Sequence, residues 1–481
     1  MDFFAELGQL ISSNGRTNAS PADVLAEIGS PSISIAVLEY GTVTSKCIST
    51  IGDDSETLFQ ACSISKPIAG MATMRLIQQG KLQLGDKIVN LLPKHVVEIL
   101  ETPQTKILLQ QITVRHLMSH TSGLSGGGFP GYSKDAPVTE IVLSGKAPAN
   151  TSQVRVEGLP GYQFSYSGGG ITVLQVILET VTGKDFPSLM KELVLQPLEM
   201  TRSFYTLPEG ETNVTKAYFT GYTPCDVDWH TQPEKAAAGL WTTPTDLLKA
   251  VRAMQRSLKS SSTDSFLKKE IARGMLSEVQ NTFALTWAAP QDPGIAFGHG
   301  GSNFPGWECF LMGYADLRGQ RKRGTDKRIL EDCGICVMTN SMNGFTVWAK
   351  VLHAISYLKG WTSIPYFDGR TAIGKVPFCA YGVEVDARWV EWKGSWVNEE
   401  KELVLEADGK GAPILRYGES VEAKLVPAAI PSLIYAGEKG KSIDLILEGL
   451  DMMVRLGWKD EKKHAELWRG AFQRVSSLDL K

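Results

Sequence analysis

Residues 58–67 read LFQACSISKP and place a serine three positions before a lysine, where a strand-like segment meets a helical one. Over residues 65–79 the apolar residues recur at three- and four-residue spacing, and Pro67 lies in the first turn, where a helix tolerates proline. This pattern predicts a helix that begins close to Ser63. Residues three apart share a helix face, so the amine of Lys66 should reach the hydroxyl of Ser63.

The Ser-x-x-Lys pattern alone does not identify a nucleophile, because it occurs at three other places in the chain. Those pairs are Ser188 with Lys191, Ser265 with Lys268, and Ser356 with Lys359. They lie in helical patterns without a neighbouring glycine turn or a preceding strand, so we expect their hydroxyls to act as caps or to face solvent. Ser63 differs, because the unpaired amides at a strand-to-helix junction can stabilise an anion.

A serine hydroxyl reacts at neutral pH only if a base takes its proton. A lysine with an ordinary pKa of about 10.4 can do this only if burial or a nearby cation keeps it neutral, so a third polar group should steer the proton. The stretch PGYQFSYSGGG offers Tyr166 on a glycine-rich turn, and FGHGGSN offers His299 on a strand whose glycines admit a substrate to the backbone. Taken alone, each pattern favours the structural reading, a core tyrosine for Tyr166 and a packed strand histidine for His299.

The composition describes an ordinary globular protein with room for two or three domains. The chain has 481 residues, of which 43% are hydrophobic and 21% are charged. The net charge is −3, and the basic run at 317–328 has no interleaved aromatic residues. Both features argue against a nucleic-acid partner. The N-terminus lacks a basic segment followed by an apolar core, and no apolar run approaches the ~18 residues that would span a bilayer. These features predict a cytoplasmic protein without a membrane partner.

The cysteines predict reduced thiols. There are seven of them, without regular spacing, which does not suit a disulfide framework. Cys333 and Cys336 form a CxxC pattern inside the apolar run CGICVMTN, which favours a buried strand over a metal or redox site.

Sequence periodicity also predicts the order of elements. Two strands joined by a tight turn should begin at Ser32, helices should follow to about residue 255, and strands should return at 297–315 and 334–340 before a last helix. Beyond about residue 375 the texture changes to short alternating segments bounded by turn residues. These are RWVEWKGSWV, KELVLEA, SIDLILEG and DMMVRLGWK, and they predict a separate β-rich domain.

Seven blocks of sequence together resemble a known family. In chain order they are LFQACSISK, ITVRHLMSHTSGL, PGYQFSYSGGGITVLQVILETVTG, LQPLEM, AAAGLWTTPTDLLK, FGHGG and VMTNSMNG. This order is similar to that in the serine β-lactamase-like hydrolases, which include class C β-lactamases, D-alanyl-D-alanine carboxypeptidases and β-lactamase-fold carboxylesterases. The resemblance covers roughly residues 25–360.

The resemblance implies an α/β (α+β) β-lactamase/transpeptidase-like fold. Its antiparallel sheet would be flanked by helices and built from both ends of a catalytic domain spanning 1–365, with an all-helical subdomain inserted at about 80–230. The β-rich domain at 375–481 resembles the small lipocalin-like appendages of some family members.

The resemblance also implies a site. Ser63, Lys66 and Tyr166 match the family's catalytic residues, and the backbone N–H groups of Ser63 and Ser302 would form the oxyanion hole. The remaining predicted site residues are those of the third family element, His299, Gly300 and Gly301; Gly168, where penicillin-recognising members carry asparagine; and the loop aromatics Phe129, Tyr132, Trp229 and Trp307. For these aromatics, lining an apolar pocket and packing in the core are both open readings.

We therefore expect a serine hydrolase that cleaves small-molecule esters through an acyl-enzyme, without a cofactor or a metal. Gly168 and His299 replace the groups that would hold an acylamide and a carboxylate, which favours esters over β-lactams. One alternative is an acyltransferase of secondary metabolism that passes the acyl group to a small-molecule alcohol. Another is a catalytically silent binding or scaffold protein, against which the intact Ser63, Lys66 and Tyr166 argue.

Overall fold

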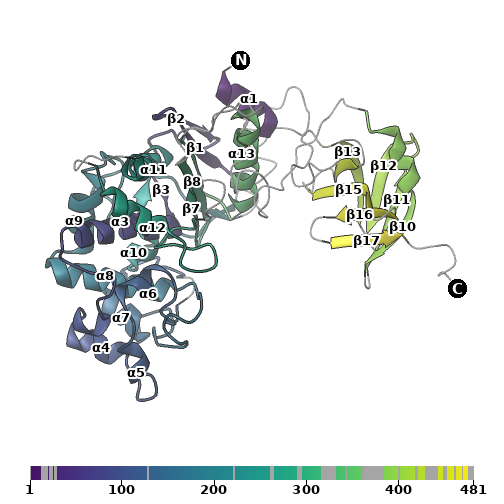
Figure 1. The fold of residues 1–481 in the computed structure, drawn as a ribbon. Coiled ribbons are helices and arrows are strands. Elements are labelled where there is room, and N and C mark those ends of the chain that lie inside the picture. Colours follow the sequence, from purple (N-terminus) through teal and green to yellow (C-terminus); the bar gives the residue numbers. More distant parts are fainter. Residues whose placement is uncertain are drawn as a thin grey trace. The chain divides into compact units, whose positions relative to one another are not determined.

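The computed structural model divides the chain into two compact units, Leu25–Trp348 and Met1–Val24 with Ala349–Lys481. It describes residues 2–11, 20, 25, 30–126, 129–219, 223–259, 265–289, 295–315, 332–342, 344–359, 361, 384–398, 401–417, 421–427, 442–447, 452–459, 462–467 and 470–474 (Figure 1). The domain boundary predicted between 365 and 375 lies outside the described residues.

A five-stranded antiparallel sheet forms the centre of the first unit. Its strand order is β2-β1-β9-β8-β7, so strands from the two ends of the catalytic region lie side by side, as the family resemblance implied. The strands are β1 (Ser32–Glu39), β2 (Thr42–Ser49), β7 (Ile295–Asn303), β8 (Trp307–Ala315) and β9 (Cys333–Thr339). All residues of β9 are buried, which confirms that the CxxC pattern belongs to a packed strand. Strand β7 lies at one edge of the sheet.

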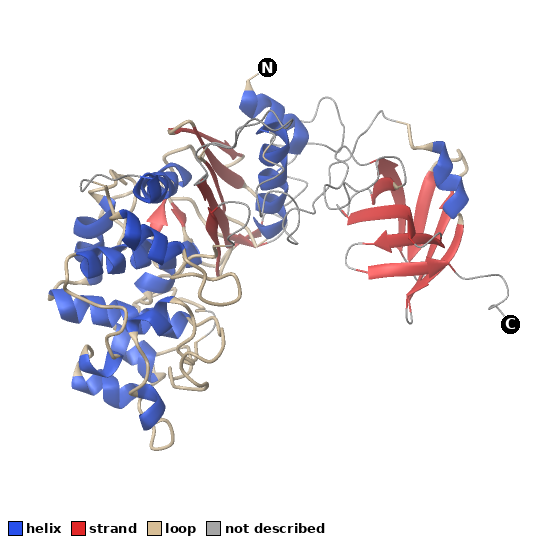
Figure 2. Cartoon of the chain, viewed as in Figure 1, coloured by secondary structure: helices blue, strands red, loops and turns tan. Residues whose placement is uncertain are grey.

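Helices and short elements connect the two halves of this sheet. They are β3 (Phe59–Gln60), η1 (Cys62–Ile64), α3 (Ser65–Gln78), η2 (Ile88–Asn90), α4 (Lys94–Leu100), α5 (Lys106–Leu109), α6 (Val114–Met118), α7 (Thr139–Ser144), α8 (Gly168–Thr182), α9 (Phe186–Met190), η3 (Lys191–Leu195), β4 (Tyr218–Phe219), β5 (Thr223–Pro224), α10 (Lys235–Ala238), β6 (Trp241–Thr242), α11 (Pro244–Lys259) and α12 (Lys269–Leu276). Figure 2 shows these connecting helices on one side of the sheet. Helix α3 confirms the prediction of a helix that begins close to Ser63.

The two faces of the sheet are covered by different elements. Helix α11 packs against β1, β8 and β9, and its apolar side belongs to the main hydrophobic core together with Leu311 of β8. Because neighbouring residues of a strand point to opposite faces, Phe310 faces the other way. Its ring stacks on that of Trp348 in α13 (Gly344–Lys359), with 4.5 Å between the ring centroids.

The second unit contains α1 (Phe3–Ile11) and an eight-stranded closed antiparallel barrel, which confirms the predicted β-rich texture. Its strands, paired in chain order, are β10 (Gly394–Asn398), β11 (Lys401–Ala407), β12 (Pro413–Tyr417), β13 (Val421–Pro427), β14 (Ile443–Leu447), β15 (Met452–Lys459), β16 (Lys462–Leu467) and β17 (Gly470–Arg474). Consecutive strand order with closure is the arrangement of up-and-down barrels.

One predicted strand of this unit is wrong at its start. The segment Ala387–Trp392, η5, is a 3-10 helix, and the strand begins only at Gly394. A 3-10 helix brings residues three apart to one side, so Trp389 and Trp392 both pack into the barrel core. The side chain of Asp386 accepts from the N–H of Arg388 and caps the turn.

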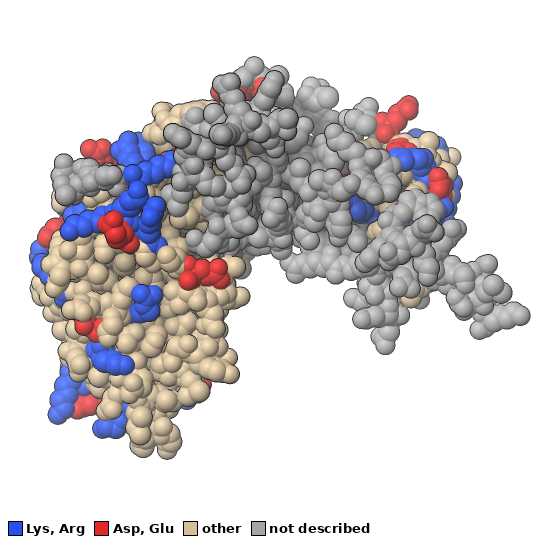
Figure 3. All heavy atoms as spheres, viewed as in Figure 1, with Lys and Arg blue, Asp and Glu red and all other residues tan. Residues whose placement is uncertain are grey.

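The surface and the helices add two observations. Figure 3 shows Lys and Arg interspersed with Asp and Glu over the described surface of one face. Within the described part of the chain, no helix combines the length and the apolar character needed to cross a bilayer.

Candidate active site

Ser63 lies where a short strand gives way to a helix, as the sequence predicts. Strand β3 pairs with β6, and the N–H of Ala61 donates to Leu240 O at 2.8 Å, which fixes the chain just before the turn η1. Helix α3 follows directly, so Ser63 sits at its N-terminal end. The partial positive charge of a helix N-terminus favours negative charge at this position.

Lys66 is in contact with Ser63. Its Nζ lies 2.8 Å from Ser63 Oγ and donates at 2.7 Å to the carbonyl oxygen of Ala237 in α10. Lys66 is only 1% exposed, whereas Ser63 remains half-buried and Ser302 is exposed. A buried amine held against a hydroxyl that solvent can reach is an arrangement that can accept the proton of that hydroxyl.

The edge strand β7 runs beside η1 and brings Ser302 close to the nucleophile. A β-carbon at Gly301 would lie 2.7 Å from Ala61 O and 2.9 Å from Cys62 Cβ, so only glycine allows this approach. An edge strand leaves alternate N–H groups without a strand partner. The oxyanion hole formed by the N–H groups of Ser63 and Ser302, which the family resemblance implies, stays a prediction.

Tyr166 lies over the amine of Lys66. The Nζ atom is 5.1 Å from the centroid of the Tyr166 ring, and the tyrosine is 39% exposed. The ring also packs on the imidazole of His120, with 4.4 Å between centroids. His120 also accepts from the N–H of Ser167 through Nδ1 at 3.1 Å, and its carbonyl oxygen accepts from the N–H of Ser165 at 2.7 Å. His120 therefore holds both backbone neighbours of Tyr166.

The two histidines near Lys66 are neutral. Burial, with the nearby Lys66, lowers the pKa of His299 to about 3 and lowers the pKa of His120 well below its ordinary value. The Nδ1 atom of His299 lies 2.5 Å from Gly300 O. His299 thus occupies the position of the family's third element without adding a positive charge.

The predicted aromatic residues separate into different environments. Trp307 is fully buried among Phe59 and Trp241, so it is a core residue and not part of an open pocket wall. Trp229 is partly buried against Trp241. Tyr132 is half-buried, and its hydroxyl accepts from the N–H of Asn150 at 3.0 Å. The sequence could not separate these cases because burial depends on distant segments.

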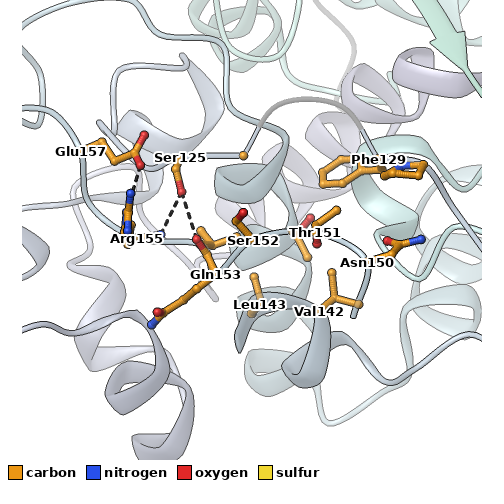
Figure 4. Close-up of a pocket in the computed structure, with 14 residues that line it drawn as sticks. Ser125, Phe129, Val142, Leu143, Asn150, Thr151, Ser152, Gln153, Arg155 and Glu157 are labelled. Carbon is orange, nitrogen blue, oxygen red and sulfur yellow. Dashed lines mark hydrogen bonds and ion pairs between the residues drawn. The ribbon is translucent and has the colours of Figure 1, made fainter. Parts of the chain in front are cut away.

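Phe129 lines a pocket of about 440 Å³ (Figure 4). The other residues that line it are Ser125, Gly126, Pro130, Val142, Leu143, Asn150, Thr151, Ser152, Gln153, Val154, Arg155, Glu157 and Thr172. Ser63, Lys66 and Tyr166 do not line this pocket. Its wall is nevertheless linked to the site, because Ser125 O accepts from Ser167 Oγ at 2.9 Å and Gly126 O accepts from the N–H of Gly168. Gly168 begins α8.

Sequence reasoning missed three residues that the fold brings to this site: Ala237, His120 and Glu234. Ala237 acts through its backbone, which no motif reveals. Glu234 precedes α10 and is 1% exposed. Its pKa is raised to about 7, first by burial, with Lys66 acting in the opposite direction. No group of three His, Cys, Asp or Glu side chains among the described residues is arranged to hold a metal ion.

Comparisons with known proteins find relatives in sequence and in structure. A family model described as Beta-lactamase matches residues 22–355. The chain is 27% identical to penicillin-binding protein 4 of Amycolatopsis lactamdurans over 155 residues, which are 32% of this chain and 38% of that protein. It is 27% identical to esterase EstB of Burkholderia gladioli over 165 residues, 32% of this chain and 40% of that protein. These matches thus span well under half of either relative.

Among solved structures, the chain is similar to the octameric penicillin-binding protein homologue from Pyrococcus abyssi. The TM-score is 0.58 at 19% identity, and the alignment covers 93% of this chain and 97% of that one. Because the identity is this low, the comparison shows a shared fold and nothing further.

Proposed function

The chain belongs to the beta-lactamase family of serine hydrolases, and on that premise we propose that it cleaves carboxylic esters of a small molecule through an acyl-enzyme. The observation that carries the proposal is the 2.8 Å separation between the buried Lys66 Nζ and Ser63 Oγ. A helix N-terminus and an edge strand lie around the same hydroxyl, where a carbonyl oxygen would acquire negative charge.

In the proposed acylation step, Ser63 Oγ attacks the ester carbonyl while Lys66 accepts the hydroxyl proton. The carbonyl oxygen becomes an oxyanion and is stabilised by the N–H groups of Ser63 and Ser302, each worth ~3 kcal/mol in comparable acyl-transfer enzymes. Tyr166, which lies over Lys66, gives its hydroxyl proton to the departing alkoxide and takes in return the proton that Lys66 received from Ser63. Water then attacks the acyl-enzyme by the same proton route in reverse.

The charges around the site support esters over β-lactams. His299 is neutral, so the third family element offers no cation to a substrate carboxylate. Gly168 has no side-chain amide to hold an acylamide, and its N–H already donates to Gly126 O. A neutral ester needs neither group.

The test is a screen of p-nitrophenyl esters of increasing acyl length, with nitrocefin as the β-lactam and Ser63→Ala as the control. We expect ester turnover that disappears in Ser63→Ala and that far exceeds nitrocefin turnover in kcat/KM. Nitrocefin hydrolysis at a kcat/KM comparable to that for p-nitrophenyl butyrate would refute the ester assignment. Repeating the screen with added alcohols separates hydrolysis from acyl transfer, because a transferase would form the alcohol's ester instead of the free acid.

A further inference from the structure

The short helix α10 links Lys66 to a carboxyl group that the proposed mechanism does not use. Lys66 Nζ donates to Ala237 O, and the N–H groups of Ala237 and Ala238 donate to the carbonyl oxygen of Glu234 at 3.0 and 2.9 Å. Gln175 of α8 fixes this segment from the other side, because its Oε1 accepts from the N–H of Ala236 at 3.0 Å. Glu234 therefore has a fixed position relative to Ala237 O, which accepts the hydrogen bond from Lys66 Nζ.

The side chain of Glu234 is buried and unpartnered. It is 1% exposed, and no other residue that the structure describes forms a hydrogen bond with either carboxylate oxygen. It does not cap α10, because no backbone N–H of the helix donates to it. A buried carboxyl that stabilises neither a helix nor an ion pair is unfavourable for folding, so its presence suggests a role in the site. Burial raises the pKa of Glu234, whereas its own backbone N–H and the charge of Lys66 favour its ionised form.

Three further buried titratable groups among the described residues are influenced by Lys66, and none of them carries a charge that could replace that of Glu234. Lys66 also affects the pKa values of Cys62 in η1, His120 and His299 of β7. Burial raises the pKa of the Cys62 thiol and lowers that of each imidazole, so all three are neutral. On α8, the pKa of Glu179 is affected by the charges of Glu140, Asp185 and Lys235.

We propose that Glu234 is a positioning residue for the Ser63–Lys66 pair, and that its ionised carboxylate stabilises the ammonium group formed when Lys66 takes the proton of Ser63. The inference rests on the proposed function. As the Oγ–H bond breaks, the proton binds the lone pair of Lys66 Nζ, Oγ bonds to the acyl carbon, and the carbonyl electron pair moves onto oxygen. Lys66 gains one positive charge in this step, and a nearby negative charge makes that gain more favourable.

The consequence is a shift in the pH at which Ser63 becomes reactive. Removing the negative charge of Glu234 makes the ammonium form of Lys66 less stable relative to the free amine, so the free base is available at lower pH in the variant. The same change makes Lys66 a weaker base, so the limiting rate at high pH falls. A residue with a purely structural role would not move the pH profile.

The experiment measures the rate at which a fluorophosphonate labels Ser63 as a function of pH, in the wild type, Glu234→Gln and Glu179→Gln. We expect the acid limb of the Glu234→Gln profile to move down by about one pH unit. Its plateau should fall about threefold. Glu179→Gln is the matched control, because it removes a partly buried carboxyl of raised pKa that faces Lys235, and its profile should match the wild type.

The outcomes separate the two proposals. If the wild type is not labelled at Ser63 at any pH, the proposed function fails, whatever Glu234 does. If the wild type is labelled and the Glu234→Gln profile superimposes on it, the role of Glu234 is refuted. If circular dichroism shows that Glu234→Gln is unfolded, Glu234→Met, which also removes the charge, takes its place in the experiment. Loss of the fold in both variants would also count against the proposal, because an unpartnered buried carboxyl should be replaceable without that loss.

Discussion

Cys62, the residue before Ser63, has a left-handed backbone conformation with φ 51°. For a residue with a β-carbon this conformation is unfavourable by roughly 1 to 3 kcal/mol, and it persists only where the surrounding structure enforces it. Here the close approach of Gly301 on β7 and the hydrogen bond from Ala61 to Leu240 enforce it. The strained residue directly precedes the serine whose hydroxyl meets Lys66, which is where a functional constraint is expected.

The residue scale gives a first prediction for Lys66. Lys66→Ala removes the base, so Ser63 should no longer become labelled by a fluorophosphonate. In the wild type the label should sit on Ser63 and not on the serines of the other Ser-x-x-Lys pairs. Mass spectrometry of labelled peptides decides this. Label on Ser188, Ser265 or Ser356 with Ser63 unmodified would show that the nucleophile is assigned wrongly.

A second prediction concerns Tyr166 as the leaving-group acid. Tyr166→Phe keeps the ring that packs on His120 and removes only the hydroxyl, so the fold should survive. Proton transfer typically contributes about 10²–10⁴-fold, and that loss should appear with an ethyl ester, whose alkoxide must be protonated. A p-nitrophenyl ester of the same acid should lose less, because its phenolate leaves without a proton.

The measurement for Tyr166 is the ratio of kcat/KM for the two esters in each protein. We expect this ratio to rise in Tyr166→Phe in favour of the p-nitrophenyl ester. An unchanged ratio would mean that Tyr166 does not protonate the leaving group and that its ring serves packing alone.

At the scale of elements, α3 carries Lys66 and is fixed by a close contact at Gly70. A β-carbon there would lie 2.1 Å from Thr286 Oγ1 and 3.1 Å from Thr286 Cβ. Thr286 cannot move easily, because it is fully buried and its N–H donates to Met118 O at 2.6 Å. The position of α3, and with it that of Lys66, therefore depends on glycine at this point.

The third prediction follows from this contact. Alanine normally stabilises a helix relative to glycine by ~1 kcal/mol. Gly70→Ala should instead destabilise the protein by about 1 to 3 kcal/mol, because it overpacks the core. Gly274→Ala in α12 is the control, because nothing lies within 4 Å of its added β-carbon, and it should be neutral or stabilising. Thermal unfolding of both variants tests this, and equal shifts of Tm for the two would disprove the steric explanation.

At the scale of the whole molecule, the main hydrophobic core and the barrel core share no residue among those that the structure describes. One extends from Ala36 to Met338 and includes the surroundings of Ser63, and the other lies within the barrel between Trp389 and Ala465. A substitution in the barrel core should therefore destabilise the barrel and leave the geometry of the Ser63–Lys66 pair unchanged.

The fourth prediction tests this independence. Leu405 is fully buried in the barrel, so Leu405→Ala should destabilise the barrel by about 2 to 5 kcal/mol. Calorimetry should show one unfolding transition shifted to lower temperature, while the rate of Ser63 labelling below that temperature stays at the wild-type value. A parallel loss of labelling in the folded variant would instead mean that the barrel contributes to the site.

The sequence by itself determined the features that depend on neighbouring residues. The periodicity after Ser63 predicted α3, alternating segments predicted four of the eight barrel strands, and the order of seven blocks predicted the family and the sheet built from both ends of the catalytic region. Helical and strand periods are local properties, so they can be read without knowing the partners. The spacing of Ser63 and Lys66 placed two side chains on one turn for the same reason.

Only the tertiary structure decided what surrounds those two residues. The carbonyl oxygen of Ala237, the ring of His120 under Tyr166 and the buried carboxyl of Glu234 come from segments far apart in the chain. The tertiary structure also placed Trp307 in the core, because burial is set by the packing of whole elements. The charge state of a site depends on that burial and on neighbours brought together by folding, so a motif names the reacting groups but not the electrostatic environment that controls them.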